Sequence, residues 1–270
     1  MKIPPLTLLY VPADRPDRVE KAIASAAHAV IVDLEDGVAP SAKAEARANL
    51  GALLGRPRDK PVYVRVNAGD DADLEAVAAL PLTGIFVPKV ERPEHVPALG
   101  LPVHCLIESA AGLEAAYEIA RTSGVAGISL GESDLRADTG AGEAGLDWAR
   151  GRVINAAVAA GLPRPAQSVY PHVRDLDGLA RSCERGRELG HLGRAAIHPD
   201  QLLVIERAFL PTEAEVTWAR EVLARAAADR GALALASGDF VDAAIVRGAA
   251  GIVALADRYG PAERYGPSAG

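Results

Sequence analysis

Cysteine and the aromatic residues are scarce in this chain of 270 residues, and the scarcity of each excludes certain classes of protein. Cysteine occurs only at Cys105 and Cys183, which form no metal-type spacing and are too few for a disulfide-stabilised fold. Aromatic residues make up 4% of the chain whereas 49% of it is hydrophobic, so the core must be mainly aliphatic. The sparse cysteines favour a protein that works in a reducing compartment.

Long apolar runs and concentrated positive charge are also missing. No run of 18 apolar residues occurs, and residues 1–5 lead directly into a short apolar run without the core of a signal peptide. The formal net charge is −7 and the basic residues are scattered, which argues against binding to nucleic acid. We therefore expect a cytoplasmic protein without a membrane or nucleic-acid partner.

Short apolar runs alternate with helical stretches over residues 1–210. Eight runs are predicted to be strands: Leu8–Val11, Ala29–Asp33, Val62–Val66, Gly84–Pro88, Val103–Ile107, Gly127–Leu130, Ala166–Tyr170 and Ala195–Ile197. The continuous apolar run Ala29–Asp33 is typical of a strand that is covered on both faces. The alternation predicts an α/β protein with a (β/α)8 TIM barrel as its catalytic domain. A doubly wound open sheet is the rival fold, but it carries a glycine-rich turn after its first strand, where this chain has two prolines in residues 12–16.

Helices are expected between these strands and beyond the last of them. Asp14 is a candidate N-cap for the first helix and Pro16 suits its first turn. The expected helices cover residues 14–27, 41–54, 71–80, 92–99, 111–121, 147–160, 176–189 and 199–209.

Residues 211–270 follow the predicted barrel. They are expected to form a helix over 211–229, an apolar hinge over 231–238, a helix over 240–255 and a frayed tail over 257–270. A helical arm outside a closed barrel has apolar faces that a neighbouring subunit can cover. We therefore predict a C-terminal arm that packs on a neighbouring subunit of a homo-oligomer.

Carboxylates follow two successive apolar runs directly. Glu108 comes after Val103–Ile107, and Asp134 comes just past Gly127–Leu130. The carboxyl ends of barrel strands meet on one face, and carboxylate oxygens are the ligands that Mg²⁺ prefers. The pair therefore predicts a magnesium site, although Ser109 and Asp134 each precede helical sequence and could serve as helix caps.

Further charged residues follow the second, third and fourth runs. Asp33, Glu35 and Asp36 form an acidic cluster that we expect to orient water and the metal ligands, together with Lys89. Arg65 suits bidentate capture of a substrate carboxylate, or else pairs with Asp33 or Glu108. A solvated acidic turn is the plainer interpretation of the cluster.

Three other features are weaker signals. Lys89 could form a Schiff base with a keto substrate, but nearby carboxylates would raise its pKa and make it a poor nucleophile. Ser129 lies in a Gly-x-Ser-x-Gly match, yet within an apolar strand and not at the sharp turn that serine hydrolases use. His198 ends the eighth run and suits a polar rim position or a bond at a helix entry.

Several ordered blocks together resemble the citrate lyase beta-subunit-like branch of the HpcH/HpaI aldolase family. The resemblance spans about residues 7–255 and is carried by residues 9–18, 30–38, 64–67, 87–89, 107–112, 131–135 and 197–199. It implies a TIM barrel, usually a homotrimer or hexamer, that binds Mg²⁺ and acts on 3-hydroxyacyl-CoA thioesters. The chain departs from the family pattern at Ser133, where the family often has glutamate, and at residues 170–172, where an acidic residue is common.

The resemblance also implies roles for individual residues. Glu108 and Asp134 match the family's two Mg²⁺ ligands, and Arg65 matches the arginine that grips the keto acid. Asp242 matches an aspartate that the arm delivers to a neighbour's active site, and the region of Arg15 and Arg18 is where CoA would be expected, near a helix N-terminus.

The implied activity is that of a Mg²⁺-dependent carbon–carbon lyase. Its substrate would be a thioester such as citramalyl-, malyl- or citryl-CoA, cleaved to a 2-keto acid and acetyl-CoA or a related thioester. Two alternatives stay open. One is a citrate lyase beta subunit that acts on an acyl-carrier-protein thioester within a complex, and the other is a metal-dependent aldolase for free hydroxy-keto acids.

Overall fold

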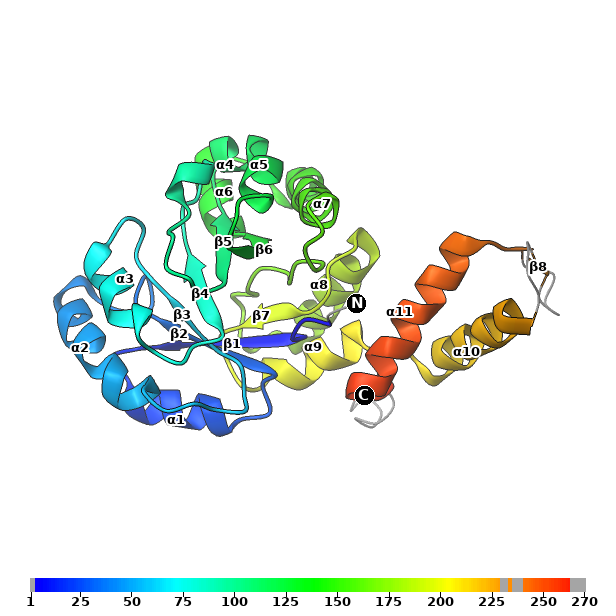
Figure 1. Ribbon diagram of the computed structural model, residues 1–270, viewed down its shortest axis with the longest axis horizontal. Helices are drawn as coiled ribbons and strands as arrows, with labels where there is room; N and C mark the ends of the chain where they lie inside the picture. The colour runs from blue at the N-terminus through cyan, green and yellow to red at the C-terminus, as the bar shows by residue number, and fades with distance from the viewer. Residues whose placement is uncertain (1–2, 229–232, 235–239, 263–270) are drawn as a thin grey trace. The chain divides into compact units, whose positions relative to one another are not determined.

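The structure is a computed structural model that describes residues 3–228, 233–234 and 240–262. The chain divides into two compact units, one formed by Pro4–Ile205 and the other by Met1–Ile3 and Glu206–Gly270. Figure 1 shows the helices and strands of both.

The larger unit is built on a parallel sheet of seven strands. The order across the sheet is β6-β5-β4-β3-β2-β1-β7, so each strand from β1 to β6 pairs with the next one along the chain. The sheet curls, and its helices lie outside it (Figure 1). The strands are β1 Thr7–Pro12, β2 Ala29–Asp33, β3 Val62–Arg65, β4 Gly84–Val87, β5 Val103–Ile107, β6 Val125–Leu130 and β7 Arg194–Ala196.

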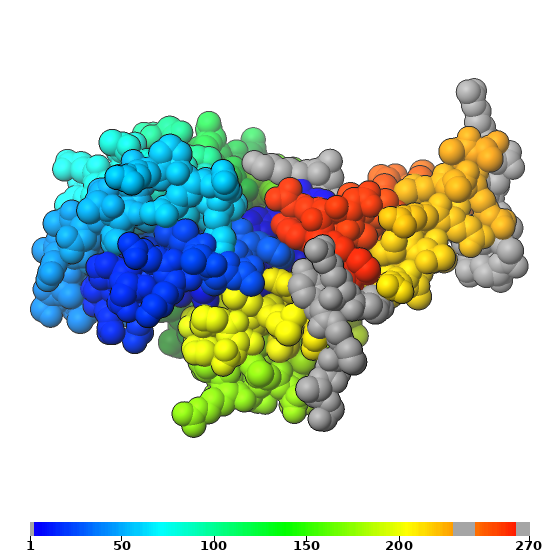
Figure 2. Space-filling view, turned by 90° about the horizontal axis from the view of Figure 1, so that it is seen from below, coloured from blue at the N-terminus to red at the C-terminus, as the bar shows by residue number. Residues whose placement is uncertain are grey.

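Helices cover the outer face of the curled sheet. In the space-filling view the dark blue surface of α1 adjoins the lighter blue of α2, so consecutive helices form a continuous outer layer (Figure 2). The α-helices are α1 Pro16–Ala24, α2 Lys43–Leu54, α3 Asp71–Ala78, α4 Ala110–Glu114, α5 Ala116–Ala120, α6 Glu132–Thr139, α7 Glu143–Ala159, α8 Leu176–Leu189 and α9 Gln201–Phe209. Two short 3₁₀ turns, Pro40–Ala42 and Pro93–His95, complete the layer.

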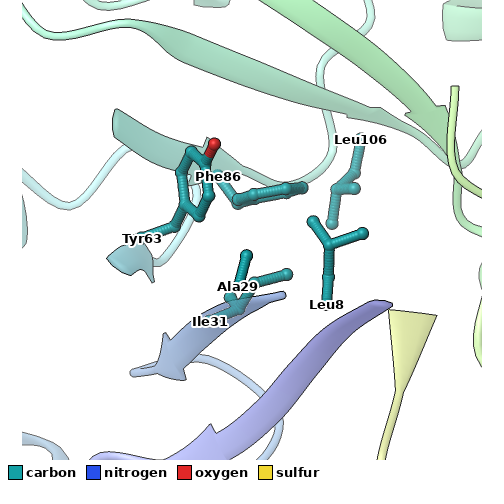
Figure 3. Close-up of a cluster of buried hydrophobic side chains, with 6 residues drawn as sticks. All are labelled: Leu8, Ala29, Ile31, Tyr63, Phe86 and Leu106. Carbon is teal, nitrogen blue, oxygen red and sulfur yellow. The ribbon is translucent and has the colours of Figure 1, made fainter. Parts of the chain in front are cut away.

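The interior of the curl is filled by side chains that alternate along each strand. Figure 3 shows the buried cluster of Leu8, Ala29, Ile31, Tyr63, Phe86 and Leu106, which come from β1 to β5. Two residues further along four of these strands stand Tyr10, Asp33, Arg65 and Glu108. Because strand side chains have a period of two, these four belong to the next interior layer, toward the carboxyl ends.

The parallel α/β class is confirmed, but the predicted strand Ala166–Tyr170 is not a strand. Its single ladder contact is an isolated bridge between Gln167 and Arg194 of β7. Pro163, Pro165 and Pro171 surround the segment, and proline has no N–H to donate to a ladder. The edges of the sheet are therefore β6 and β7 among the residues that the structure describes.

Several predicted helix bounds are wrong for local reasons. The helix expected over 92–99 is a single 3₁₀ turn, because Val96 precedes a proline and is extended. Asp14 does not cap α1: Arg15 holds the N-cap position without a side-chain bond, and Pro16 begins the helix. The helix expected over 111–121 is divided at Ala115 into α4 and α5. Helix α6 was not expected as a separate element.

The smaller unit contains two helices and a short strand pair. Helices α10 (Glu213–Ala228) and α11 (Ala243–Tyr259) pack through Ala219, Val222 and Ala249, and strand β8 (Leu233–Ala234) pairs antiparallel with β9 (Phe240–Val241). Thr212 and Glu215 bond to each other's backbone N–H at the start of α10, as in a capping box.

Parts of the sequence prediction for this unit cannot be compared with the structure. The expected hinge over 231–238 lies outside the described residues except for 233–234, and the expected tail lies outside them from residue 263 onward. Across the described residues, no helix is both long and apolar enough to cross a membrane.

Candidate active site

A cavity of about 470 Å³ opens at the carboxyl ends of the strands in the larger unit. Its walls come from all seven strands of the sheet, from the starts of α1 and α6 and from residues 166–169. Of the residues predicted from the sequence, six line it: Arg18, Asp33, Asp36, Arg65, Glu108 and Asp134. The structure thus brings together residues that are far apart in the chain, at the end of the strands where barrel enzymes place their active sites.

Glu108 directly follows β5, and Asp134 lies in the first turn of α6, the helix that follows β6. Glu108 is 7% exposed, whereas Asp134 is exposed in the first turn of α6. Burial, together with the nearby charges of Glu35 and Asp134, raises the pKa of Glu108 to about 7, although the hydrogen bond from the Lys89 backbone acts in the opposite direction. The two carboxylates therefore repel each other, which is the electrostatic setting that a divalent cation relieves.

Lys89 supports Glu108 with its backbone and not with its side chain. The Lys89 N–H donates to Glu108 Oε1 at 2.6 Å. Lys89 has φ of 55°, the left-handed region, and is the one non-glycine residue with positive φ among the described residues. Such a conformation costs about 1–3 kcal/mol and is typical of functional sites. The backbone is strained where it has to reach this carboxylate.

Gly131 leaves room for Glu108. A Cβ at this position would lie 2.3 Å from Glu108 Oε2 and 2.6 Å from its Cβ, closer than real contacts allow. The Gly131 N–H also donates to the carbonyl of Ile107, which ties the end of β6 to the end of β5. A glycine is therefore required for α6 to begin next to this carboxylate.

Arg65 pairs with two carboxylates of the acidic turn. Its Nε and Nη2 donate to the two oxygens of Asp33, both at 2.7 Å, and its Nη1 lies 2.8 Å from Glu35 Oε2. The interpretation of Arg65 as a partner of Asp33 is confirmed. Asp33 also accepts from the N–H groups of Glu35 and Gly37, so it fixes both the turn and the guanidinium.

Glu35 connects Arg65 to the Lys89 side chain. Its second oxygen lies 3.2 Å from Lys89 Nζ, and its own pKa is raised chiefly by burial. The bond to Glu35 raises the pKa of Lys89, as expected for an amine that remains charged and is a poor Schiff-base nucleophile. Neither Glu35 nor Lys89 lines the cavity, so both act on it through their neighbours.

The remaining predicted residues are spread more widely. Asp36 and Arg18 are exposed on the cavity wall, whereas Arg15 is exposed but does not line it. Asp242 belongs to the smaller unit, where its Oδ1 accepts from the N–H groups of Ala244 and Ile245 and caps α11. This capping role was not predicted from the sequence.

The alternative roles considered for neighbouring residues can also be compared with the structure. Ser109 caps α4 by accepting from the Gly112 N–H, so that interpretation is confirmed. The cap position of α6 is Gly131, so the interpretation of Asp134 as its cap is wrong. His198 Nδ1 accepts from the N–H of Asp200 at the entry to α9. Ser129 lies inside β6, two residues before the turn at Gly131 that leads into α6.

Two supporting networks behind the cavity were missed from the sequence. Arg150, on α7, binds Glu132 with two nitrogens at 2.9 and 2.7 Å and holds the start of α6. Asn67 donates to the carbonyl of Leu34 and to buried Asp73, and so links the turns after β2 and β3. Both networks join residues from separate elements, which a single sequence cannot pair.

The donor set fits a magnesium ion of the kind that keeps part of its water shell. Glu108 Oε2 and the exposed Asp134 carboxylate offer oxygen ligands on one cavity wall, and Mg²⁺ often takes only one or two protein carboxylates. No group of three or more His, Cys, Asp or Glu side chains placed to hold a metal occurs among the described residues. Water and substrate would have to complete the coordination.

The chain belongs to the HpcH/HpaI aldolase/citrate lyase family. The family model matches residues 6–101 and 97–199, and it confirms the family predicted from the sequence. This family defines the fold class and groups the chain with aldolases and lyases.

Relatives and a solved structure give the finer comparison. A citrate lyase subunit beta-like protein of Mycobacterium tuberculosis is 37% identical over 88% of this chain and 90% of its own length. From Cereibacter sphaeroides, a (3S)-malyl-CoA thioesterase is 36% identical over 81% of each chain, and an L-malyl-CoA/beta-methylmalyl-CoA lyase is 33% identical over 92% of this chain and 93% of its own. The crystal structure of CitE from M. tuberculosis, in complex with magnesium, acetoacetate and coenzyme A, has a TM-score of 0.82 and 34% identity, over 94% of this chain and 98% of that one.

Proposed function

We propose that this protein is a Mg²⁺-dependent carbon–carbon lyase that cleaves a 3-hydroxyacyl-CoA thioester to a 2-keto acid and a shorter thioester. The observation that carries the proposal is the cavity in which the buried carboxylate of Glu108, the exposed carboxylate of Asp134 and the guanidinium of Arg65 meet. The similar CitE structure holds magnesium, a keto acid and coenzyme A together, which supports the same set of ligands here.

Glu108 and Asp134 are proposed as the protein ligands of Mg²⁺. When bound, the ion would supply positive charge to the oxygens of the acid end of the substrate and favour loss of the hydroxyl proton. Lys89 keeps Glu108 in place through its backbone N–H, and Gly131 keeps the space beside it open. The chain's own contribution is therefore a firmly held Glu108 carboxylate next to the exposed carboxylate of Asp134.

Arg65 is proposed to bind the carboxylate of the keto-acid part. Three of its five N–H groups are used by Asp33 and Glu35, which leaves two for a ligand. Because Asp33 binds one edge of the guanidinium through two hydrogen bonds and Glu35 binds Nη1, the guanidinium is oriented before the substrate arrives. Arg18, on the cavity wall, is proposed to contact the CoA portion, with Arg15 further out on the same helix end.

The remaining part of the proposal concerns the assembly. Residues 166–170 are proposed to take the place of the eighth strand in a closed barrel, and the C-terminal helices to form an arm that packs on a neighbouring subunit. Asp242 of that arm would protonate the enolate left on the thioester after the carbon–carbon bond breaks. Its Oδ2 takes part in no hydrogen bond among the described residues, so the capping bonds leave one oxygen for this role.

A thioesterase is the second candidate, because a relative of almost the same identity carries that name. Hydrolysis would give a free hydroxy acid and a free thiol, whereas carbon–carbon cleavage gives a keto acid and leaves the thioester bond intact. The two reactions therefore differ in both products.

The decisive experiment is an assay of the purified chain on malyl-, citramalyl- and citryl-CoA, with separate detection of keto acid and of free thiol. We expect keto acid without thiol, and no product after a chelator removes Mg²⁺. Thiol without keto acid would replace the lyase with a thioesterase. Activity only on free hydroxy-keto acids, or only on an acyl-carrier-protein thioester within a complex, would support one of the two alternatives considered from the sequence.

A further inference from the structure

Tyr10 is a polar residue of the cavity that has no role in the reaction proposed above. It lies on β1, two residues after Leu8, and packs on the interior cluster of Figure 3 while its side chain also lines the cavity. Tyr10 is only partly buried and is one of the residues that line the cavity. The phenol therefore belongs to the same interior layer as Glu108 and packs against the apolar layer below it.

Arg65 fixes the ring of Tyr10. The guanidinium carbon lies 5.0 Å from the ring centroid, within the range of a cation–π contact. Because Asp33 and Glu35 hold the same guanidinium, the ring and the cation form one rigid unit. Tyr10 is thus positioned by the residue that is proposed to bind the substrate carboxylate.

The hydroxyl of Tyr10 is a neutral donor among charges. Burial raises the pKa of Tyr10, Arg65 opposes this, and Asp33 and Glu108 add to it, so the phenol keeps its proton. Among the described residues the hydroxyl makes no hydrogen bond, unlike Tyr170, whose hydroxyl donates to Asp175 at 2.6 Å. Partly buried tyrosine hydroxyls usually find a partner, and here the open side is the cavity.

The hydrogen-bond donors around Arg65 suit an oxygen acceptor as that partner. Asp33 and Glu35 balance Arg65 and Lys89, so the cluster offers donors without excess charge. The two unused N–H groups of Arg65 and the O–H of Tyr10 are three donors beside the Glu108–Asp134 pair. A carboxylate, or the keto oxygen next to it, can accept from such a set.

We propose that Tyr10 is a substrate-contacting residue whose hydroxyl donates a hydrogen bond to an oxygen of the 2-keto acid held by Arg65. The inference rests on the proposed function and specifies the part of the substrate that is recognised. It assigns Tyr10 to the acid end of the substrate and not to the CoA portion.

The test compares Tyr10→Phe with Tyr63→Phe by calorimetric titration of glyoxylate, pyruvate and oxaloacetate into Mg²⁺-loaded protein. Tyr10→Phe keeps the ring under Arg65 and removes only the hydroxyl. We expect roughly tenfold or more weaker keto-acid binding, since a hydrogen bond to a charged group is lost. Binding of Mg²⁺ and of CoA, and the unfolding temperature, should not change. Tyr63→Phe removes a hydroxyl that does not line the cavity and should bind as the wild type does.

The possible failures are distinguishable. If the wild type binds a keto acid and Tyr10→Phe binds it equally well, the role of Tyr10 is overturned while the proposed function stands. Weaker CoA binding with unchanged keto-acid binding would also overturn it, because the hydroxyl would then serve the other end of the substrate. If the wild type binds no keto acid with Mg²⁺ present, both proposals fail together.

Discussion

Burial of Glu108 places a negative charge where folding alone disfavours one. The pKa of about 7 shows that the protein holds this carboxylate in a setting that favours its neutral form. The strained backbone at Lys89 and the absence of a side chain at Gly131 both allow the Glu108 carboxylate to occupy this position. Residues arranged against stability in this way are typical of sites kept for function.

Replacement of Glu108 by Gln should therefore stabilise the metal-free protein. At pH 8 the variant avoids a buried charge and can still accept from Lys89, so we expect its free energy of unfolding to rise by on the order of 1–3 kcal/mol. Stabilisation by added Mg²⁺ should disappear. Denaturant unfolding with and without Mg²⁺ measures both effects, and a variant less stable than the metal-free wild type would contradict the expectation.

The buried side chain of His191 makes the free energy of unfolding depend on pH. It is fully buried, its Nδ1 lies 3.2 Å from the carbonyl oxygen of Pro165, and burial lowers its pKa to about 4. Between that value and the ordinary pKa near 6.5, the unfolded chain binds the proton and the folded one does not. Stability contributed by neutral His191 is thus present above pH 6.5 and is lost as the pH falls toward 4.

The corresponding experiment is unfolding of wild type and His191→Gln across pH 4 to 7. The wild-type free energy of unfolding should fall by up to about 1.4 kcal/mol per pH unit from this group, and the variant should lack that part of the slope. His198→Gln, at an only partly buried histidine, is the matched control and should keep the wild-type slope. Equal slopes in all three proteins would remove His191 from the acid response.

Among the elements, the sequence predicts best where burial alone decides the structure. The continuous apolar runs of β2 and β5 begin and end where expected, because strands covered on both faces leave a plain pattern. Residues 166–170 have the composition of a strand but lie between prolines, and their course is set by contacts with β7 and α8. Such contacts come from distant parts of the chain and are not visible in a local pattern.

The residues of the candidate site likewise divide into those that a local sequence pattern predicts and those that it does not. Glu108, Asp134, Asp33 and Arg65 could be predicted because charged residues after apolar runs are conspicuous. Tyr10 was not predicted as a site residue, because in the sequence it is one of several residues in an apolar run. The period of two along β1 does predict that its side chain points into the interior of the curled sheet. The Arg150–Glu132 pair joins α7 to α6, and no spacing in the sequence reveals it.

Arg194 should determine how firmly residues 167–170 are held. It is 2% exposed, its Nη1 donates to Gln167 at 3.1 Å and to Ser182 at 2.9 Å, and its guanidinium carbon lies 5.5 Å from the Tyr170 ring centroid. Arg194→Lys keeps the charge but cannot reproduce this geometry. We expect the free energy of unfolding to fall by about 1–3 kcal/mol.

Denaturant unfolding checks this expectation, with Arg181→Lys as the control. Arg181 is an exposed arginine of α8, and its replacement should change stability by less than about 0.5 kcal/mol. Equal stability of the two variants would mean that the buried guanidinium contributes no more than a surface one.

At the scale of the whole molecule, substitution of Asp242 can distinguish its structural role as the cap of α11 from its proposed chemical role as a general acid. Asn caps helices about as well as Asp, so Asp242→Asn should keep α11 and the unfolding temperature. Under the proposed mechanism it should also keep Mg²⁺ and keto-acid binding but lose turnover by roughly 10²–10⁴-fold, the usual contribution of a general acid. Normal turnover in this variant would remove Asp242 from the mechanism.

Mixed assemblies test whether Asp242 acts on a neighbouring subunit. If Arg65→Lys and Asp242→Asn subunits are each inactive alone, as the mechanism predicts, they should regain part of the activity when unfolded together and refolded as a mixture. An assembly with an intact cavity on one subunit and an intact arm on the next would form in such a mixture. No recovery, with mixed oligomers present, would place Asp242 in its own subunit's reaction or outside the reaction.

The segment over residues 166–170 has a further consequence for how such a protein can diversify. One wall of the cavity is made by residues 166–169, which share a single bridge with β7 and interrupt no ladder of the sheet. Exchanges at Val169 can therefore reshape this wall of the cavity without disrupting the pairing of the strands. Substitutions in this segment, whether by evolution or by design, can therefore change the range of substrates while the proposed metal ligands stay in place.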